Sequence, residues 1–283
     1  MSLTVVVGSG SVKCAASLGM FRLLRREGVA IDRLVGCSAG AIYTACIALG
    51  MSVEEAAEKN RTLWTREVAE RANRRAMWQA LFPRALRFTE EWGLKDDRLL
   101  ERRLAAAFGD RTFEDCNIPL HITATDFSNG EQVVLSRGRI VDAIRASLAL
   151  PFAFPPVRID GRLLVDGFMS DPLPVGVAIR EGADVVIAMG FESVYQERIH
   201  SPSRFAMQLS SILSNNLLKA MFAFHGAAHH GELLLVVPQF TQRVRLFDVE
   251  KMPYIMDVGE RAMAEQLPYL RRLLESRAVG AGA

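Results

Sequence analysis

Short β-branched runs alternate with longer helical patterns along this chain, and that alternation limits the possible folds more than any other feature. The runs at 3–7 (LTVVV), 32–36 (DRLVG) and 184–191 (DVVIAMGF) have the length and composition of buried strands. Segments 15–28 and 39–50 instead have the length and composition of helices. Further strands are predicted at 118–127, 131–136, 162–167 and 232–240, and a closing amphipathic helix at 256–276. This order is typical of an α/β fold in which crossover helices connect the strands of a parallel sheet.

The composition indicates a globular chain. Of its 283 residues, 50% are hydrophobic and 23% are charged, and the sequence has neither an internal repeat nor a convincing linker. We therefore predict a single domain over residues 1–276 and a mobile C-terminal tail over 277–283. The formal net charge of +2 is too small to indicate a nucleic-acid partner.

The cysteines, the histidines and the N-terminal residues indicate the cellular setting. The four cysteines and five histidines form no C-x-x-C pair and no metal-ligand spacing, which favours reduced thiols. The N-terminus lacks a basic region and a small-residue cleavage site, and no stretch of 18 apolar residues occurs. These features predict a cytoplasmic protein without a membrane span, and they leave peripheral contact with a membrane open.

The segment LVGCSAGAIYTACIALG places a serine between two glycines, after a strand-like run and before a helical one. A serine at the apex of a strand-to-helix elbow needs small neighbours, so Gly36 and Gly40 suit a nucleophilic Ser38. The following helix would offer its N-terminal N–H groups to developing negative charge. The alternative is a small-residue turn that only packs a helix on a sheet.

A second small-residue loop, VVVGSGSVKCAASLG, follows the first strand. A dinucleotide fingerprint counted from Gly8 needs a glycine where Lys13 stands, and a Walker loop needs a Gly-Lys-Ser/Thr sequence that is absent. The loop is therefore interpreted as a set of backbone N–H groups at a helix N-terminus, on a strand that neighbours the one leading to Ser38. Such groups can stabilise an oxyanion.

A nucleophilic serine needs a base, and the sequence favours an acid over a histidine. Ser38 comes too early for the Ser, Asp, His order of an ordinary α/β-hydrolase. His121 lies in a strand-like run, and three other histidines lie in or beside an apolar helical stretch (225, 229 and 230). Asp166 is the better candidate, because it ends the buried run RLLVD and Gly167 after it permits a close turn. A turn aspartate without a catalytic role is the alternative.

Three ordered segments together resemble the patatin-like phospholipases, in particular the compact bacterial members. They are the loop GSGSVKCAASLGMFRLLRREG, the elbow GCSAG, and the run VDAIRASLALPFAFPPVRIDGRLLVDGFMSDPLPVGVAIREGADVVIA. The similarity covers nearly the whole chain. The resemblance implies a three-layer α/β/α fold with a largely parallel central sheet. It also implies a Ser–Asp dyad, with Ser38 as the nucleophile and Asp166 as the base, and neither a metal nor an organic cofactor.

The resemblance assigns supporting roles to several further residues. Gly36 and Gly40 would form the nucleophile elbow, and Gly167 would form the turn that follows the base. The oxyanion hole would consist of backbone N–H groups of the first loop (Ser9, Gly10, Ser11 and Val12).

The chain departs from the family pattern at a few of these positions. Ser9, Ser11 and Cys14 stand where the family usually has glycine, so positive φ angles or crowding there would alter the oxyanion hole. Phe168 stands where the family has Gly or Ala and would narrow the acyl pocket.

The implied function is hydrolysis of acyl esters of lipids, of the phospholipase A or lysophospholipase type, through an acyl-enzyme. Its substrate would be a lipid or another acyl ester. The alternatives are a carboxylesterase, an acyl-thioesterase, or a catalytically silent scaffold that binds acyl lipids.

Residues 61–88 concentrate basic and aromatic side chains. The stretch holds seven arginines and two glutamates, interleaved with aromatic residues (Trp64, Trp78, Phe82 and Phe88). Such a combination on a helical pattern suits an anionic membrane surface. We predict that the stretch flanks the mouth of the site as a lid or docking surface, with an ordinary solvated helix as the alternative.

Overall fold

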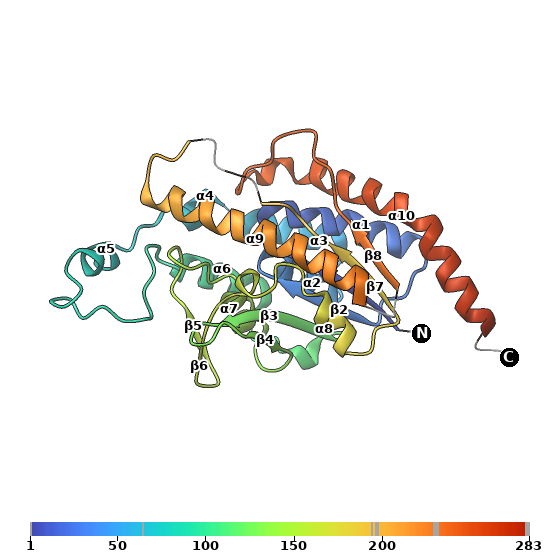
Figure 1. Cartoon of the computed structure of the whole chain (residues 1–283), viewed down its shortest axis with the longest axis horizontal. Helices are drawn as coiled ribbons and strands as arrows, with labels where there is room; N and C mark the ends of the chain where they lie inside the picture. The colour runs from blue at the N-terminus through green and yellow to red at the C-terminus, as the bar shows by residue number, and fades with distance from the viewer. Residues whose placement is uncertain (1, 64, 194, 196–197, 229–231, 281–283) are drawn as a thin grey trace.

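One eight-stranded sheet forms the centre of the described part of the computed structural model, with helices on both of its faces (Figure 1). The structure describes residues 2–63, 65–193, 195, 198–228 and 232–280. The strand order is β5-β6-β3-β2-β1-β7-β8, and β4 also pairs with β3. The strands are β1 Leu3–Val7, β2 Arg33–Cys37, β3 Leu120–Asp126, β4 Gln132–Leu135, β5 Val157–Ile159, β6 Arg162–Asp166, β7 Val185–Met189 and β8 Glu232–Val236.

Most of the sheet is parallel, as predicted. β1 pairs in parallel with β2 and with β7, β2 with β3, and β7 with β8. Antiparallel pairs join β3 to β4, β3 to β6 and β5 to β6 at one side of the sheet. Because parallel strands bring their carboxyl ends to one edge, the segments that follow β1, β2 and β7 meet there.

Two layers of helix cover the sheet. The α-helices are α1 Ala16–Arg26, α2 Ala39–Ala48, α3 Val53–Leu63, α4 Arg66–Glu70, α5 Arg74–Leu81, α6 Arg98–Phe108, α7 Ile140–Ser147, α8 Val175–Arg180, α9 Pro202–Ala228 and α10 Met252–Gly280. The short 3-10 helices are η1 Ser11–Ala15, η2 Phe113–Asp115, η3 Gly167–Met169 and η4 Val249–Lys251.

The two faces of the sheet have separate apolar cores because successive residues of a strand point to opposite sides. Val5 and Val7 belong to the core shared with α1, α2, α3, α6, α7 and α10. Val6 belongs to the core shared with α8 and with Leu218 of α9. The predicted three-layer α/β/α fold is therefore confirmed.

The closing helix is longer than predicted, since α10 begins at Met252 and continues to Gly280. Residues 277–280 of the predicted tail are thus helical, 281–283 lie outside the described residues, and mobility of the tail stays a prediction. Among the described helices, none is long and apolar enough to cross a membrane.

The basic stretch at 61–88 is divided between the end of α3, the short α4 and α5. The side chain of Asn73 caps α5 by accepting the N–H of Ala76 over 3.1 Å. The helix ends at Leu81, two residues before Pro83, whose missing N–H and bulky ring disfavour a further helical turn. Trp64 lies outside the described residues, whereas Trp78 is 57% exposed.

Candidate active site

Ser38 lies between the end of β2 and the start of α2, in a backbone conformation that few side chains adopt. Its φ of 53° and ψ of −128° are strained for a residue that carries a Cβ. A Cβ added at Gly40 would lie 2.4 Å from the Val7 carbonyl oxygen, and one added at Gly36 would lie 2.3 Å from Thr44 Oγ1. Close packing therefore requires both elbow glycines and presses the turn against the end of β1.

The sheet brings Asp166, the last residue of β6, to Ser38. Cys37, which precedes Ser38, pairs with Thr123 of β3. The next residue of β3, Ala124, pairs with Asp166. The Ser38 hydroxyl donates a hydrogen bond to Asp166 Oδ2 over 2.8 Å. The residues that the sequence singled out as nucleophile and base are thus in direct contact.

A tight turn after β6 fixes the Asp166 carboxyl group. Its Oδ1 accepts the N–H of Phe168 over 3.1 Å. Gly167 lies so close to β3 that an added Cβ would be 2.4 Å from the Thr123 carbonyl oxygen. The Phe168 side chain is buried rather than in solvent.

Burial dominates the electrostatics of this pair. Asp166 is 3% exposed, and desolvation raises its pKa from 3.8 to about 7. The hydrogen bonds from Phe168 and Ser38 favour the ionised form and lower the pKa, but by less than burial raises it. A carboxyl group with a pKa near neutrality has the proton affinity that suits a general base.

The glycine and serine loop after β1 lies against the elbow, since Gly40 also faces the Gly8 carbonyl oxygen. The Ser9 N–H donates to the Pro172 carbonyl over 2.8 Å, so this N–H already has a partner within the chain. Ser11, at the start of η1, has a φ of 57°, and its hydroxyl donates to the Leu246 carbonyl over 2.7 Å. Of the three residues that replace glycines, Ser11 is the one with positive φ, and neither Ser9 nor Cys14 has it.

The side chains of Lys13 and Cys14 donate hydrogen bonds to backbone carbonyl groups. Lys13 Nζ donates to the Glu192 carbonyl over 3.0 Å and lies 5.5 Å from the centre of the Phe240 ring. Desolvation lowers the Lys13 pKa. The buried Cys14 thiol donates to the Gly8 carbonyl over 3.3 Å, which ties the loop to its own helix.

Ser147 is a residue of the site that the sequence did not reveal. This fully buried serine ends α7, and its hydroxyl accepts the backbone N–H of Ser38 over 2.7 Å. The same hydroxyl donates to the Thr123 carbonyl over 2.7 Å. Ser147 thus joins the strained turn to β3 and gives the buried N–H of Ser38 a hydrogen-bond acceptor.

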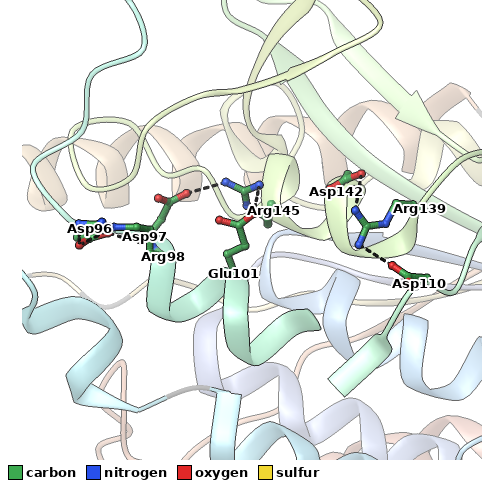
Figure 2. A network of polar contacts seen from close by, with 8 residues as sticks. All are labelled: Asp96, Asp97, Arg98, Glu101, Asp110, Arg139, Asp142 and Arg145. Carbon is green, nitrogen blue, oxygen red and sulfur yellow. Dashed lines mark hydrogen bonds and ion pairs between the residues drawn. The ribbon is translucent and has the colours of Figure 1, made fainter. Parts of the chain in front are cut away.

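Ion pairs hold α7 in place on its outer side, as Figure 2 shows. Arg145 Nη2 lies 3.0 Å from Asp97 Oδ2, and its Nη1 lies 3.2 Å from Glu101 Oε1, so α7 is tied to α6. Arg139, at the start of α7, pairs with Asp110 over 3.0 Å. These half-buried and exposed pairs orient the helix that carries Ser147.

Two other titratable groups near the sheet do not contact the serine hydroxyl. His121 Nε2, in β3, lies 3.8 Å from the Oε2 atom of Glu181, the residue that ends α8. Burial lowers the His121 pKa. Asp171 is buried, and desolvation raises its pKa to about 6, but its carboxyl group accepts the N–H of Leu173 and a hydrogen bond from Gln132. Residues 229 and 230 lie outside the described residues.

A comparison with solved structures supports the fold described above. VipD from Legionella pneumophila has a solved structure that matches 95% of this chain and 67% of VipD, with a TM-score of 0.52 and 14% identity. The family model for patatin-like phospholipases matches residues 5–179, which is more than half of the chain. The chain therefore belongs to the patatin-like phospholipase family, a family of lipid hydrolases.

Curated relatives are similar over about two thirds of the chain. An uncharacterized NTE family protein of Mycobacterium bovis is 30% identical over 187 residues, which are 66% of this chain and 48% of the relative. The neuropathy target esterase of Drosophila melanogaster is 28% identical over 191 residues, 66% of this chain and 13% of the relative. The matched part is thus less than half of each of these two relatives.

Proposed function

We propose that this chain hydrolyses acyl esters of lipids, as a phospholipase A or lysophospholipase, through a covalent acyl-serine at Ser38. The proposal rests on the hydrogen bond of 2.8 Å between Ser38 Oγ and Asp166 Oδ2. A serine hydroxyl is a weak nucleophile until a base accepts its proton, and a carboxylate in direct contact is suited to do so.

The reaction proceeds in two halves. Asp166 accepts the Ser38 proton as Oγ attacks the ester carbonyl carbon and forms a tetrahedral oxyanion. The bond to the leaving alcohol then breaks, and the alcohol departs with the proton from Asp166. Water attacks the acyl-serine and gives a proton to Asp166, and the fatty acid leaves as Ser38 regains its proton. Neither a metal nor an organic cofactor is needed for these steps.

Backbone N–H groups of the loop after β1 would stabilise the oxyanion. The Ser9 N–H donates to Pro172, so the proposal is restricted to Gly10, Ser11 and Val12. These N–H groups lie at the N-terminus of η1, which begins at Ser11, and the positive end of a helix dipole favours negative charge there.

The test of this proposal is the variant Ser38→Ala, assayed on lysophospholipids, diacyl phospholipids and nitrophenyl esters of graded chain length. Hydrolysis should be abolished on every substrate while the circular dichroism spectrum is unchanged. Activity within tenfold of the unaltered protein would contradict the proposal. Replacing all five histidines with Gln should cost far less, because a histidine base is not required.

The same panel distinguishes the alternatives. Preference for short soluble esters or for thioesters would indicate a carboxylesterase or an acyl-thioesterase. Absence of turnover and of labelling by a fluorophosphonate probe would indicate a silent lipid-binding scaffold.

We also propose that the segment Arg74–Phe88, called the basic cap, contacts anionic membranes at the periphery. Its large apolar side chains are exposed: Met77, Trp78, Leu81, Phe82, Leu86 and Phe88. The arginines of the cap are exposed as well: Arg74, Arg75, Arg84 and Arg87. Figure 1 shows α5 and the turn that follows it projecting from one end of the molecule.

Hydrogen bonds connect the basic cap to the surroundings of the dyad. Trp92 Nε1 donates to the Ala76 carbonyl over 2.8 Å, and the Leu94 N–H donates to the Phe152 carbonyl over 3.1 Å. Three residues before Phe152, the Ala149 carbonyl accepts the N–H of Asp166 over 3.0 Å. The cap is therefore linked through residues 92–94 and 149–152 to the end of β6 that carries Asp166.

The contact is tested by the triple variant Arg71→Gln, Arg74→Gln and Arg75→Gln, which changes two arginines of the cap and the exposed Arg71 just before it. It should bind anionic vesicles more weakly than the unaltered protein does and still hydrolyse a short soluble ester. The preference for anionic over zwitterionic vesicles should shrink as salt screens the charges. Equal binding of both vesicle types by both proteins would contradict the contact.

A further inference from the structure

Helix α9 presents an apolar face to solvent, which is the reverse of the usual pattern of a surface helix. Five large apolar side chains on it are between 36% and 62% exposed: Phe205, Leu209, Ile212, Leu213 and Phe224. The first four lie at spacings of three and four residues, and Phe224 follows Leu213 by eleven residues, which is about three helical turns. Figure 1 shows α9 running across the outside of the molecule, with no other helix in front of it in this view. An exposed apolar stripe of this length marks an interaction surface.

Polar side chains on the opposite face of α9 fix this orientation. Ser214 and Asn215 are buried, and Leu218 packs against the sheet. The Asn215 side chain accepts the N–H of Ser193 over 2.7 Å and donates to the Ser193 carbonyl over 3.0 Å. A rotation that buried the apolar stripe would break both hydrogen bonds, so the stripe stays at the surface.

The charges of α9 indicate what covers the stripe. The helix contains no Asp or Glu, and its exposed Arg204 and Lys219 are basic. A second copy of the chain packed on this face would bring these cations together without an acidic residue of α9 to pair with them. An anionic lipid surface instead offers both an apolar layer and negative head groups.

We propose that the apolar face of α9 lies in the interfacial layer of an anionic lipid bilayer. The helix then lies along the membrane plane, with its apolar side chains among the acyl chains and Arg204 and Lys219 at the level of the head groups. This surface is separate from the basic cap. The inference rests on the proposed function, because it takes a lipid as the substrate of the active site.

The anchor of α9 leads toward the glycine and serine loop. Asn215 holds Ser193, and Phe191 lies two residues before Ser193. Phe191 packs closely on Gly10, because a Cβ added at Gly10 would lie 2.6 Å from the Phe191 ring. In the same segment the Glu192 carbonyl accepts Lys13 Nζ. Docking of α9 on a bilayer would therefore set this loop at a fixed position relative to the lipid.

The test is sedimentation with vesicles of equal parts phosphatidylcholine and phosphatidylglycerol. The chain of 283 residues with Ser38→Ala is used as the background, so that hydrolysis does not alter the vesicles. The triple variant Leu209→Gln, Leu213→Gln and Phe224→Gln should bind at least about 30-fold more weakly, because three apolar side chains no longer enter the lipid. The control Tyr269→Gln removes an exposed ring from α10, in the other helical layer, and should bind as the background does.

Three outcomes decide the proposal. Loss of binding in the triple variant but not in the control supports it. Equal binding by the triple variant and the background overturns it. The proposal is also overturned if the background protein is a dimer in sedimentation velocity and the triple variant is a monomer. Hydrolysis of a short soluble ester is measured separately, with Ser38 present: the α9 triple variant should retain it, whereas its absence in the unaltered protein would contradict the proposed function instead.

Discussion

Replacing Asp166 with Asn should make the protein inactive and more stable in the same step. Burial raises the Asp166 pKa from 3.8 to about 7, so the native state disfavours the carboxylate that the reaction needs. Asn has the same shape, and its side-chain oxygen can still accept the Phe168 N–H. It cannot accept a proton from Ser38, so kcat should fall by at least about 100-fold.

The size of the stabilisation follows from the pKa. Because the native state binds the Asp166 proton more tightly than the unfolded state does, protonation stabilises the folded protein. This stabilisation is fully present below the unfolded pKa, near 4, and is lost as the pH rises through the native pKa, near 7. One pH unit corresponds to about 1.4 kcal/mol, so the native carboxylate costs about 4 kcal/mol above pH 7. Asp166→Asn removes this cost, and the gain in unfolding free energy should grow from less than about 1 kcal/mol at pH 4 to about 4 kcal/mol at pH 8.

Urea unfolding of the two proteins across this pH range is the assay, and Asp171→Asn is the matched control. Asp171 is also buried with a raised pKa, about 6, but its carboxyl group bonds Leu173 and Gln132 instead of Ser38. Its variant should also gain stability, levelling off near pH 6, and should remain active. A stability difference for Asp166→Asn that does not change with pH, or a less stable variant, would refute the reasoning.

Two further substitutions test the elbow. Ser147→Ala leaves the buried Ser38 N–H without its acceptor, so it should cost about 1–3 kcal/mol of unfolding free energy and lower kcat about tenfold. The control Ser17→Ala removes a buried hydroxyl from α1 and should leave kcat unchanged. Equal kcat values for the two variants would exclude a positioning role for Ser147. Gly40→Ala forces a Cβ toward the Val7 carbonyl and should cost about 1–3 kcal/mol with loss of activity. The control Gly182→Ala meets no neighbouring atom but places a Cβ at a φ of 78°, so it should cost about 1–2 kcal/mol and stay active. A stable, active Gly40 variant would contradict the close packing seen at the elbow.

The fold and the contact between Ser38 and Asp166 were predictable because their signals are local. Buried strands, the glycines around Ser38 and the aspartate before Gly167 each appear as short patterns, and the family resemblance places them in one arrangement. The register of β2, β3 and β6 then brings Ser38 and Asp166 into contact.

Other features depend on contacts between distant segments, which no local pattern records. Ser147 looks like any small residue at a helix end, and its contact with Ser38 joins residues 109 positions apart. The Ser9 N–H appeared available for an oxyanion, but Pro172 accepts it. The basic stretch had a helical pattern, yet a cap at Asn73 and Pro83 divide it. The pattern of α9 does not reveal which of its faces is buried.

The central claim is that Ser38 becomes acylated with Asp166 as its base, and the most direct measurement is acid quenching during turnover of a lysophospholipid, followed by peptide mass spectrometry. The account predicts an added acyl group on the peptide that contains Ser38, no such group in Ser38→Ala, and formation at least about 100-fold slower in Asp166→Asn. Turnover with the acyl group on another residue, or with the same rate of acylation in Asp166→Asn, would contradict it.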